Sequence, residues 1–364
     1  LALTQSSSQP KNELKVIGVE TLKEAIDYLE GKKEIMPSKS AIEDLLKETK
    51  DPIDLDFIQG QDHAKRSLEI VAGGGHNLLM VGPPGAGKTL LAKSLPSLLP
   101  SLSFEEALEV TKIYSVAGML PKNKLVSQRP FRNPHHTSSE TALIGGGNPP
   151  RPGEITLAHR GILFLDEFPE FHRDALESLR QPIEEGEITI LRAKHSLTLP
   201  ARFTLVSAAN PCPCGYLNNP DKQCSCSNSQ IQMYRRKLSG PLIDRIDLFA
   251  DVPQLKYEKL VSSDQSGLGR KIKERVKIAR LIQQERFSND QTNSEMTIPQ
   301  IKQYCQVGSD SQNLLRRYVD SGKLSARGYH RVLKVARTIA DLEGSASILH
   351  EHLSEAVMYR PKEV

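Results

Sequence analysis

A glycine-rich segment, Gly82–Thr89 (GPPGAGKT), has the spacing G-x-x-x-x-G-K-[ST] that binds phosphate groups. Its glycines let successive backbone N–H groups turn toward phosphate oxygens, while Lys88 can reach the β- and γ-phosphates and Thr89 can ligate Mg²⁺. An apolar run, HNLLMV, precedes the segment, and a helical pattern, LLAKSL, follows it, as this chemistry requires. We therefore expect ATP to bind here. The expected contacts are Ile58, Gly60, Gly82, Pro83, Pro84, Gly85, Ala86, Gly87, Lys88, Thr89, Leu90 and Asp166.

Two other apolar runs end in polar side chains that suit hydrolysis of a phosphate bond. The run GILFLDEF contains Asp166 and Glu167 near its end, and TLVSAAN ends in Asn210. One carboxylate can hold Mg²⁺, directly or through water, while the second orients and deprotonates the attacking water. Asp166 is thus a predicted magnesium ligand with Thr89, and Glu167 is the predicted base. Asn210 is expected to bind the water or the γ-phosphate from a strand between the other two. For the carboxylates alone, an ordinary acidic strand end is the alternative.

Two arginines are candidates for contacts with the γ-phosphate. Arg245 lies between two aspartates in SGPLIDRIDLF, in an expected loop after the last core strand, from which it can reach a neighbouring subunit. A surface salt bridge is the alternative for Arg245. Arg327 opens a predicted helix, SARGYHRVLKVARTIADL, and is expected to face the phosphates.

Four of the five cysteines lie close together, with the spacing C-x-C-x9-C-x-C. Zinc takes four thiolates in a tetrahedron, and no C-x-x-C redox pair is present, so the pattern favours a structural zinc site. The expected effect is to stiffen the loop 210–228, which follows Asn210. Free reduced thiols are the alternative. The predicted zinc ligands are Cys212, Cys214, Cys224 and Cys226.

These residues need a scaffold that brings the ends of the apolar runs together. The runs are apolar at almost every position and alternate with helical segments, which favours a parallel sheet buried on both faces. From about residue 268 the chain reads as helix throughout. Helices are predicted in TLKEAIDYLEG, at 41–50, in RKIKERVKIARLIQQERF, and around 309–321, 327–343 and 351–360.

The composition sets only broad limits. A chain of 364 residues with a formal net charge of +4 and a mean hydropathy of −0.40 is ordinary, so any nucleic-acid site must be local. No apolar run approaches the roughly 18 residues of a membrane span, and no signal peptide is visible, so we expect a cytoplasmic protein. The expected parts are 1–50, a linker with a remnant of an N-terminal domain; 51–265, an α/β ATPase domain; and 266–364, a helical lid domain.

Longer motifs carry a resemblance to a known family. They are RPFRNPHHTSS, LIGGGNPPRPGEITLAHRGILFLDEFPEF, LRQPIEEGEITILRA, AANPCPCGY and LSGPLIDRIDL. With the ATP motifs, they make the sequence similar to AAA+ ATPases and, more narrowly, to the magnesium-chelatase-like ComM/YifB family. The resemblance implies an α/β fold, a P-loop AAA+ core with a parallel sheet, helix-2 and pre-sensor-1 insertions, and an all-helical lid domain. The resemblance also implies an N-terminal S5/Lon-like domain, of which we expect the given sequence to contain only a remnant.

The same resemblance implies a homo-hexameric ATPase that moves along single-stranded, forked or branched DNA, as branch-migration helicases of natural transformation do. Insertions are expected at 112–152 and in EEGEITILRAKHSLTLPARF, where two strands flank the tip RAKH. A basic tip in a central channel suits a phosphate backbone. Solvated turns or loop packing are the alternatives. The DNA candidates are Arg132, His135, His136, Arg192 and Lys194.

Other functions compete with the DNA motor. A magnesium-chelatase-type ATPase would remodel a protein partner, and the cysteine cluster and PHHT segment argue against it. An activator of RNA polymerase would carry a GAFTGA loop, which the sequence lacks. A Lon-like protease would need a Ser–Lys module, and none is evident.

Overall fold

The structure is a computed structural model that describes most of the chain after residue 53. The described residues are 17–19, 21–35, 54–120, 125–147, 150–192, 195–219, 222–238, 240, 242–255 and 267–361, with the side chains of 191–195 excluded. Contacts divide the chain into two units, Leu1–Lys47 and Glu48–Val364. In the first, α1 (Leu22–Leu29) is the helix predicted in TLKEAIDYLEG, and it begins where the Thr21 hydroxyl accepts a hydrogen bond from the backbone N–H of Glu24. The helix predicted at 41–50 lies outside the described residues.

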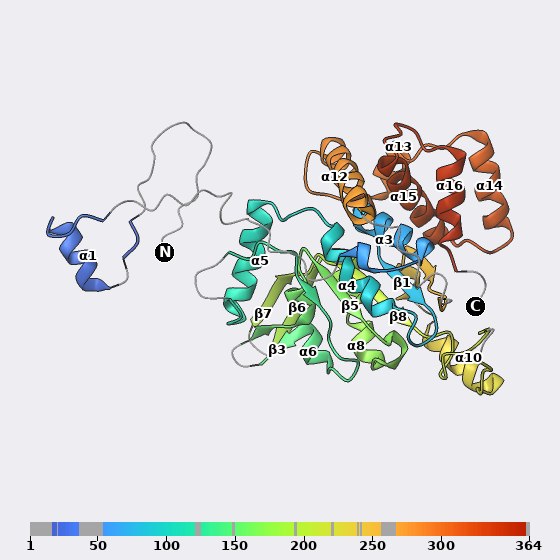
Figure 1. Ribbon diagram of the computed structural model, residues 1–364, viewed down its shortest axis with the longest axis horizontal. Coiled ribbons are helices and arrows are strands. Elements are labelled where there is room, and N and C mark those ends of the chain that lie inside the picture. The colour runs from blue at the N-terminus through green and yellow to red at the C-terminus, as the bar shows by residue number, and fades with distance from the viewer. Residues whose placement is uncertain are drawn as a thin grey trace. The chain divides into compact units, whose positions relative to one another are not determined.

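The second unit is built on a five-stranded parallel sheet in the order β2-β5-β8-β1-β9 (Figure 1). The three strands predicted from apolar runs are confirmed. The strand that leads to Asn210, β8, lies between β1 and β5 as expected. The strands are β1 (Leu78–Val81), β2 (Phe131–Arg132), β5 (Ile162–Leu165), β8 (Thr204–Ala209) and β9 (Leu248–Asp251).

Both faces of this sheet are covered, which explains the unbroken apolar runs. On one face, Met80, Phe164 and Val206 share a core with α3 (Asp62–Gly74), α4 (Lys88–Leu98) and helices of the C-terminal region. Their sequence neighbours point to the other face, where they pack against the turns and short helices that follow residue 140. These include α6 (Glu140–Ile144), α7 (Glu154–Leu157), η2 (Phe168–Glu170), α8 (Arg173–Glu177) and α9 (Arg180–Glu185).

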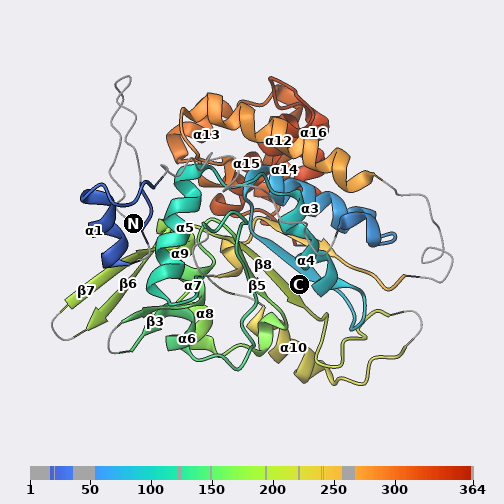
Figure 2. The same cartoon turned by 60° about the vertical axis from the view of Figure 1, so that its left-hand side comes forward.

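Two additions to the sheet lie in the expected insertions. The first follows α5 (Phe104–Val116) and contains β2, α6 and the two-residue strands β3 (Gly145–Gly146) and β4 (Arg151–Pro152). The second is an antiparallel hairpin of β6 (Glu187–Arg192) and β7 (His195–Pro200), which confirms the two strands predicted around the RAKH tip. The hairpin projects away from the five-stranded sheet (Figure 2).

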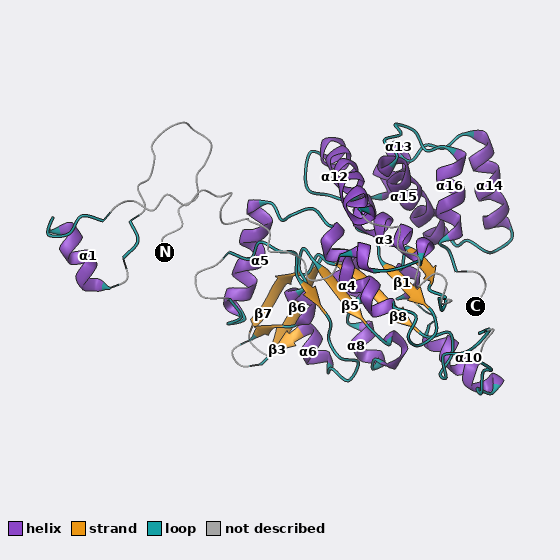
Figure 3. Ribbon diagram, viewed as in Figure 1, coloured by secondary structure: helices purple, strands orange, loops and turns teal. Residues whose placement is uncertain are grey.

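The chain after residue 267 is helical, as predicted (Figure 3). A buried carboxylate, Asp341, holds the region together by accepting hydrogen bonds from Arg286, Asn293 and Arg337. One short helix, α13, is not predicted from the sequence. The helices are α12 (Leu268–Phe287), α13 (Ile298–Tyr304), α14 (Ser309–Asp320), α15 (Ala326–Leu342) and α16 (His350–Met358).

Candidate functional site

The phosphate-binding loop connects the carboxyl end of β1 to the start of α4. Gly85 and Gly87 have φ angles of 76° and 89°, which are left-handed values that favour glycine. Close approach explains Gly82, because a Cβ there would lie 2.0 Å from the carbonyl oxygen of Val252. The loop borders a pocket of about 420 Å³. The lining residues are Pro84, Gly85, Ala86, Gly87, Lys88, Thr89, Leu90, Asp166, Glu167, Ala208, Ala209 and Asn210.

The Lys88 ammonium group is held at the base of this pocket. Its Nζ donates hydrogen bonds to the carbonyl oxygens of Gly82 (2.6 Å) and Pro83 (2.9 Å) and to Oδ1 of Asn210 (3.1 Å). Burial lowers the pKa of Lys88, and the charges of Asp166 and Glu167 oppose that shift. A buried cation that has only neutral direct partners is well suited to an anionic phosphate.

The oxygen atoms beside Lys88 fit Mg²⁺. The Thr89 hydroxyl donates a hydrogen bond of 2.7 Å to Oδ2 of Asp166, so a hydroxyl from the first turn of α4 and a carboxylate oxygen from the end of β5 already meet. Magnesium binds one or two such protein oxygens together with substrate phosphates and keeps several waters. Thr89 and Asp166 would hold the ion, which would neutralise charge on the phosphates.

Glu167 follows Asp166 in an unusual backbone conformation. Its φ angle is 52°, a left-handed value that costs an L-residue roughly 1–2 kcal/mol, and strain of this kind is concentrated at functional sites. Its Oε2 lies 3.0 Å from Nδ1 of His136, a residue of the first insertion that was predicted as a DNA contact. The His136 ring also lies 4.2 Å from that of His135 and 6.5 Å from that of Phe171, centroid to centroid. The insertion therefore touches the predicted base directly.

Four expected ATP contacts do not line the pocket: Gly82 and Pro83 of the loop itself, and Ile58 and Gly60 of an earlier segment. The adjacent Gln61 joins their segment to the phosphate-binding loop, because its Nε2 donates to the carbonyl oxygens of Ala86 (3.2 Å) and Pro253 (2.7 Å). Gln61 was not a sequence candidate. Its φ of 57° depends on tertiary packing and leaves no local sequence signal.

Arg245 lies at the amino-terminal ends of the sheet strands, whereas Lys88 lies at their carboxyl-terminal ends. The prediction that it follows the last core strand is wrong, because η3 (Ile243–Arg245) leads directly into β9, which pairs with β1. Arg245 therefore sits at the amino ends of parallel strands, whereas the phosphate-binding loop is at their carboxyl ends. Its Nη2 lies 2.6 Å from Oε1 of Glu184, and its side chain is 11% exposed. Within one chain, Arg245 does not line the nucleotide pocket.

Arg327 is also absent from the pocket lining of its own chain, so the expectation that it faces the phosphates stays a prediction. The reason is where α15 packs. Arg331, one turn after Arg327, donates through Nη1 to the carbonyl oxygen of Arg245 (3.1 Å) and to Oδ1 of Asp247 (2.5 Å). The helix α15 is thus attached to the amino-terminal ends of the sheet strands, and Arg327 is exposed near the start of α15.

The four clustered cysteines meet as predicted. Their sulfur atoms all lie within 4.8 Å of one another, and Cys212 lies 3.4 Å from Cys214 and 3.7 Å from Cys224, sulfur to sulfur. A tetrahedron with Zn–S bonds of about 2.3 Å requires sulfur separations of about 3.8 Å, so the site fits zinc. A hydrogen bond with the Tyr216 backbone, followed by one with Ser225, lowers the pKa of Cys214 to about 5.

The chain matches the magnesium chelatase subunit ChlI family over residues 54–260 and the C-terminal region of that subunit over residues 268–360. It belongs to this family of AAA+ proteins. The match confirms the resemblance and the α/β fold class inferred from the motifs.

Relatives with the ComM and YifB names are similar over most of the chain. An uncharacterized protein named YifB from Escherichia coli (strain K12) is 45% identical over 311 residues, which is 84% of this chain and 60% of that protein. The competence protein ComM of Haemophilus influenzae is 42% identical over 344 residues, 94% of this chain and 67% of that protein. The magnesium-chelatase 38 kDa subunit of Cereibacter sphaeroides is 27% identical over 179 residues, 44% of this chain and 54% of that subunit. The chain thus spans about 60–67% of its ComM and YifB relatives.

The residues predicted to contact DNA differ from one another in their surroundings. Arg132 donates two hydrogen bonds to Glu154, from Nε to Oε2 at 2.6 Å and from Nη2 to Oε1 at 2.7 Å. This pair connects two parts of the chain on either side of α6, so Arg132 stabilises the first insertion. His135 is exposed and contacts the Thr137 hydroxyl through Nδ1 at 2.9 Å. Arg192 belongs to the end of β6, but its side chain and all of Lys194 lie outside the described residues.

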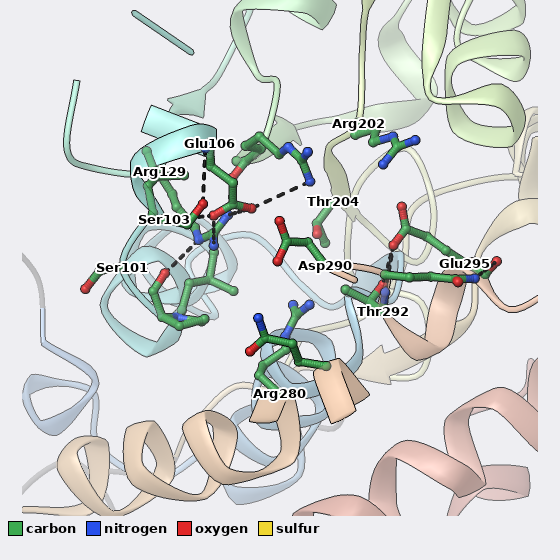
Figure 4. A pocket seen from close by; sticks show the side chains of 18 of the residues that line it. Ser101, Ser103, Glu106, Arg129, Arg202, Thr204, Arg280, Asp290, Thr292 and Glu295 are labelled. Carbon is green, nitrogen blue, oxygen red and sulfur yellow. Dashed lines mark hydrogen bonds and ion pairs between the residues drawn. The ribbon is translucent and has the colours of Figure 1, made fainter. Parts of the chain in front are cut away.

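A second cavity, of about 360 Å³, lies at the amino edge of the sheet next to α12 (Figure 4). Its charged groups are largely engaged with one another. Arg129 donates to Glu106 through Nη2 at 2.9 Å, and Arg160 lies 3.6 Å from Glu106, Nη1 to Oε1. Burial lowers the pKa of Arg280 to about 10, with a further contribution from Arg129. Because this cavity is remote from Lys88 and Asp166, it is not the nucleotide site.

Among the residues that the structure describes, each helix is either too short or too polar to span a membrane.

Proposed function

We propose that the chain is the motor part of an ATP-driven, homo-hexameric DNA translocase, a branch-migration helicase of DNA uptake and recombination. Lys88, Thr89, Asp166, Glu167 and Asn210 support ATP hydrolysis, because one pocket brings them together. A relative named as a competence protein covers 94% of the chain, which supports a role in transformation.

The observation that carries the motor proposal is the ion pair between Arg245 and Glu184. Glu184 belongs to α9, which ends at Glu185, and β6 of the hairpin begins at Glu187. The arginine proposed to reach the neighbour's γ-phosphate is thus attached to the base of the hairpin proposed to contact DNA. A change at the phosphate would move Arg245, and the hairpin base would follow.

The competing proposal is a magnesium-chelatase-type ATPase that remodels a protein partner. The chelatase subunit of Cereibacter sphaeroides supports it, but it aligns with 44% of this chain, against 94% for the competence protein. ATPase assays of the full-length protein with single-stranded, forked and junction DNA separate the two. The motor requires stimulation by DNA and a hexamer in solution. A hexamer that neither binds DNA at low salt nor is stimulated by it would favour the chelatase type.

We predict that the hairpin tip contacts phosphates without reading sequence. Arg192→Ala and Lys194→Ala should each flatten the dependence of single-strand affinity on salt, by about 0.7 in the log–log slope per lost contact. DNA-stimulated ATPase should fall and basal ATPase should remain, because the hairpin is remote from Lys88. Fluorescence titrations over a salt series measure the slope. Arg173→Ala is the control, since its side chain is 88% exposed on α8. An unchanged slope in both tip variants would refute the contact.

We also propose zinc at the four cysteines. The chain purified without chelators should hold one zinc per molecule, as measured by elemental analysis. Replacing Cys212 or Cys226 with serine should lower the zinc content strongly, because the site has no spare thiolate among the described residues. Cys305→Ser should leave it unchanged, since Cys305 lies in the helical region, apart from this cluster. A zinc content near zero in the unmodified chain would show that the thiols are free.

A further inference from the structure

The cysteine cluster lies directly against the phosphate-binding loop. Gly215, the residue after Cys214, is buried with a φ of 85°, and its N–H donates to the carbonyl oxygen of Cys212 at 2.9 Å. A Cβ added to Gly215 would lie 2.4 Å from Cδ and 2.7 Å from Cγ of Pro84. The turn that joins two of the cysteines therefore packs on a residue that lines the nucleotide pocket.

A second connection runs through Asn210. This residue precedes Cys212 by two positions, and its Oδ1 accepts the hydrogen bond from Lys88. After Cys226 the chain enters α10 (Asn228–Lys237), whose first turn is capped by Ser227 and whose Tyr234 is buried. Burial raises the pKa of Tyr234 to about 12, opposed by a hydrogen bond with the Asn210 backbone. Both ends of the cysteine loop thus return to Asn210.

We propose that zinc binding at the cysteine cluster and nucleotide binding at the phosphate-binding loop are thermodynamically coupled, so that each strengthens the other. The proposal rests on the zinc assignment made above. Four Zn–S bonds would close the segment between Cys214 and Cys224 and fix the turn at Gly215. Without the metal, that segment regains conformational freedom, and both Pro84 and Asn210 lose a fixed neighbour.

The first test compares zinc-loaded and zinc-depleted chain. Zinc is removed with a zinc-selective chelator, and the affinity for a fluorescent ATP analogue is measured with Mg²⁺ present. Coupling between sites is typically about 5–150-fold, so depletion should weaken analogue binding by a factor in that range. Because coupling is reciprocal, saturating analogue should tighten zinc binding by the same factor. Re-addition of zinc should restore the affinity, which excludes irreversible unfolding as the cause.

The second test changes the contact and keeps the metal ligands. Gly215→Ala should retain one zinc per chain and still weaken analogue binding, because its Cβ would displace Pro84 or the turn. Gly322→Ala is the matched control. It has a similar φ of 73°, but an added Cβ would have no neighbour within 4 Å. Thermal unfolding of both variants measures the cost of the backbone strain that they share.

The outcomes separate the two proposals. A chain that holds no zinc contradicts the metal assignment and, with it, the coupling. A chain that holds zinc, binds the analogue equally well after depletion, and shows no difference between the two glycine variants overturns the coupling alone. Loss of analogue affinity on depletion, reciprocal strengthening of zinc binding, and a specific defect in Gly215→Ala establish it.

Discussion

Replacement of Glu167 with glutamine is expected to leave ATP bound and to slow its hydrolysis by about 10²–10⁴-fold, the contribution of a positioned general base. The amide keeps the size of the side chain and can still occupy its place near His136, but it cannot accept the proton of the attacking water. Lys88, Thr89 and Asp166 are untouched, so affinity for ATP should remain. Steady-state turnover and binding of an ATP analogue, measured on the same sample, test both parts.

Two variants calibrate this result. Lys88→Ala should abolish nucleotide binding, because Lys88 is the only lysine among the described residues that line the pocket. Glu170→Gln should hydrolyse ATP at the parent rate, because Glu170 lies three residues further along with a half-exposed side chain that makes only a long contact with Lys237, at 3.8 Å. If Glu167→Gln matches Glu170→Gln in turnover, the general base has been assigned to the wrong residue.

What the sequence predicts well is local. The phosphate-binding loop requires only the spacing of Gly82–Thr89 and the strand and helix on either side of it. The cysteine cluster is similar, because its ligands are two to fourteen positions apart and one loop brings them together. β5 is evident because all of its residues are buried, which demands a continuous apolar run.

The missed elements depend on partners that are distant in the sequence. β2 has two residues and β9 has four, and each is a strand only because it pairs with β5 or β1. β2 has no apolar pattern of its own, and the apolar run of β9, from Leu248 to Ala250, is too short to indicate a strand by itself. Without β9, the direction of the chain at Arg245 could not be assigned, which is why the sequence placed that arginine after the sheet.

The contact between His136 and Glu167 could not be predicted for the same reason. His136 belongs to the first insertion, whereas Glu167 follows β5, and the turns that bring them together include positions with little sequence signal. The position of the C-terminal helices is also a tertiary effect, since Thr338 of α15 and His76, in the turn before β1, share a hydrogen bond of 2.7 Å across a long sequence separation. Motifs therefore identify the chemical groups, and long-range packing decides which of them share a pocket.

The second large effect that we expect is the loss of ATP hydrolysis on replacement of Arg245, whose place in the fold is set by long-range packing. Because Arg245 lies at the opposite edge of the sheet from its own Lys88, we expect it to act on the γ-phosphate of a neighbouring subunit. An arginine finger is worth about 10³–10⁵ in rate. Arg245→Ala should therefore bind ATP normally and lose most of its hydrolysis, as measured by turnover at saturating ATP with analogue binding as the reference.

Mixed rings distinguish this role from a structural one. Subunits with Glu167→Gln have an impaired base but an intact Arg245, whereas Arg245→Ala subunits have an intact base. Mixing the two should restore part of the activity, because each type supplies what its neighbour lacks. Glu184→Gln is the control for the ion pair: it removes the charged partner of Arg245, and the Glu184 side chain is 53% exposed, so the fold should tolerate the change. If Glu184→Gln loses as much activity as Arg245→Ala and mixtures show no rescue, Arg245 serves the structure of its own chain. If rescue occurs and Glu184→Gln still hydrolyses ATP, the arginine acts across the subunit interface.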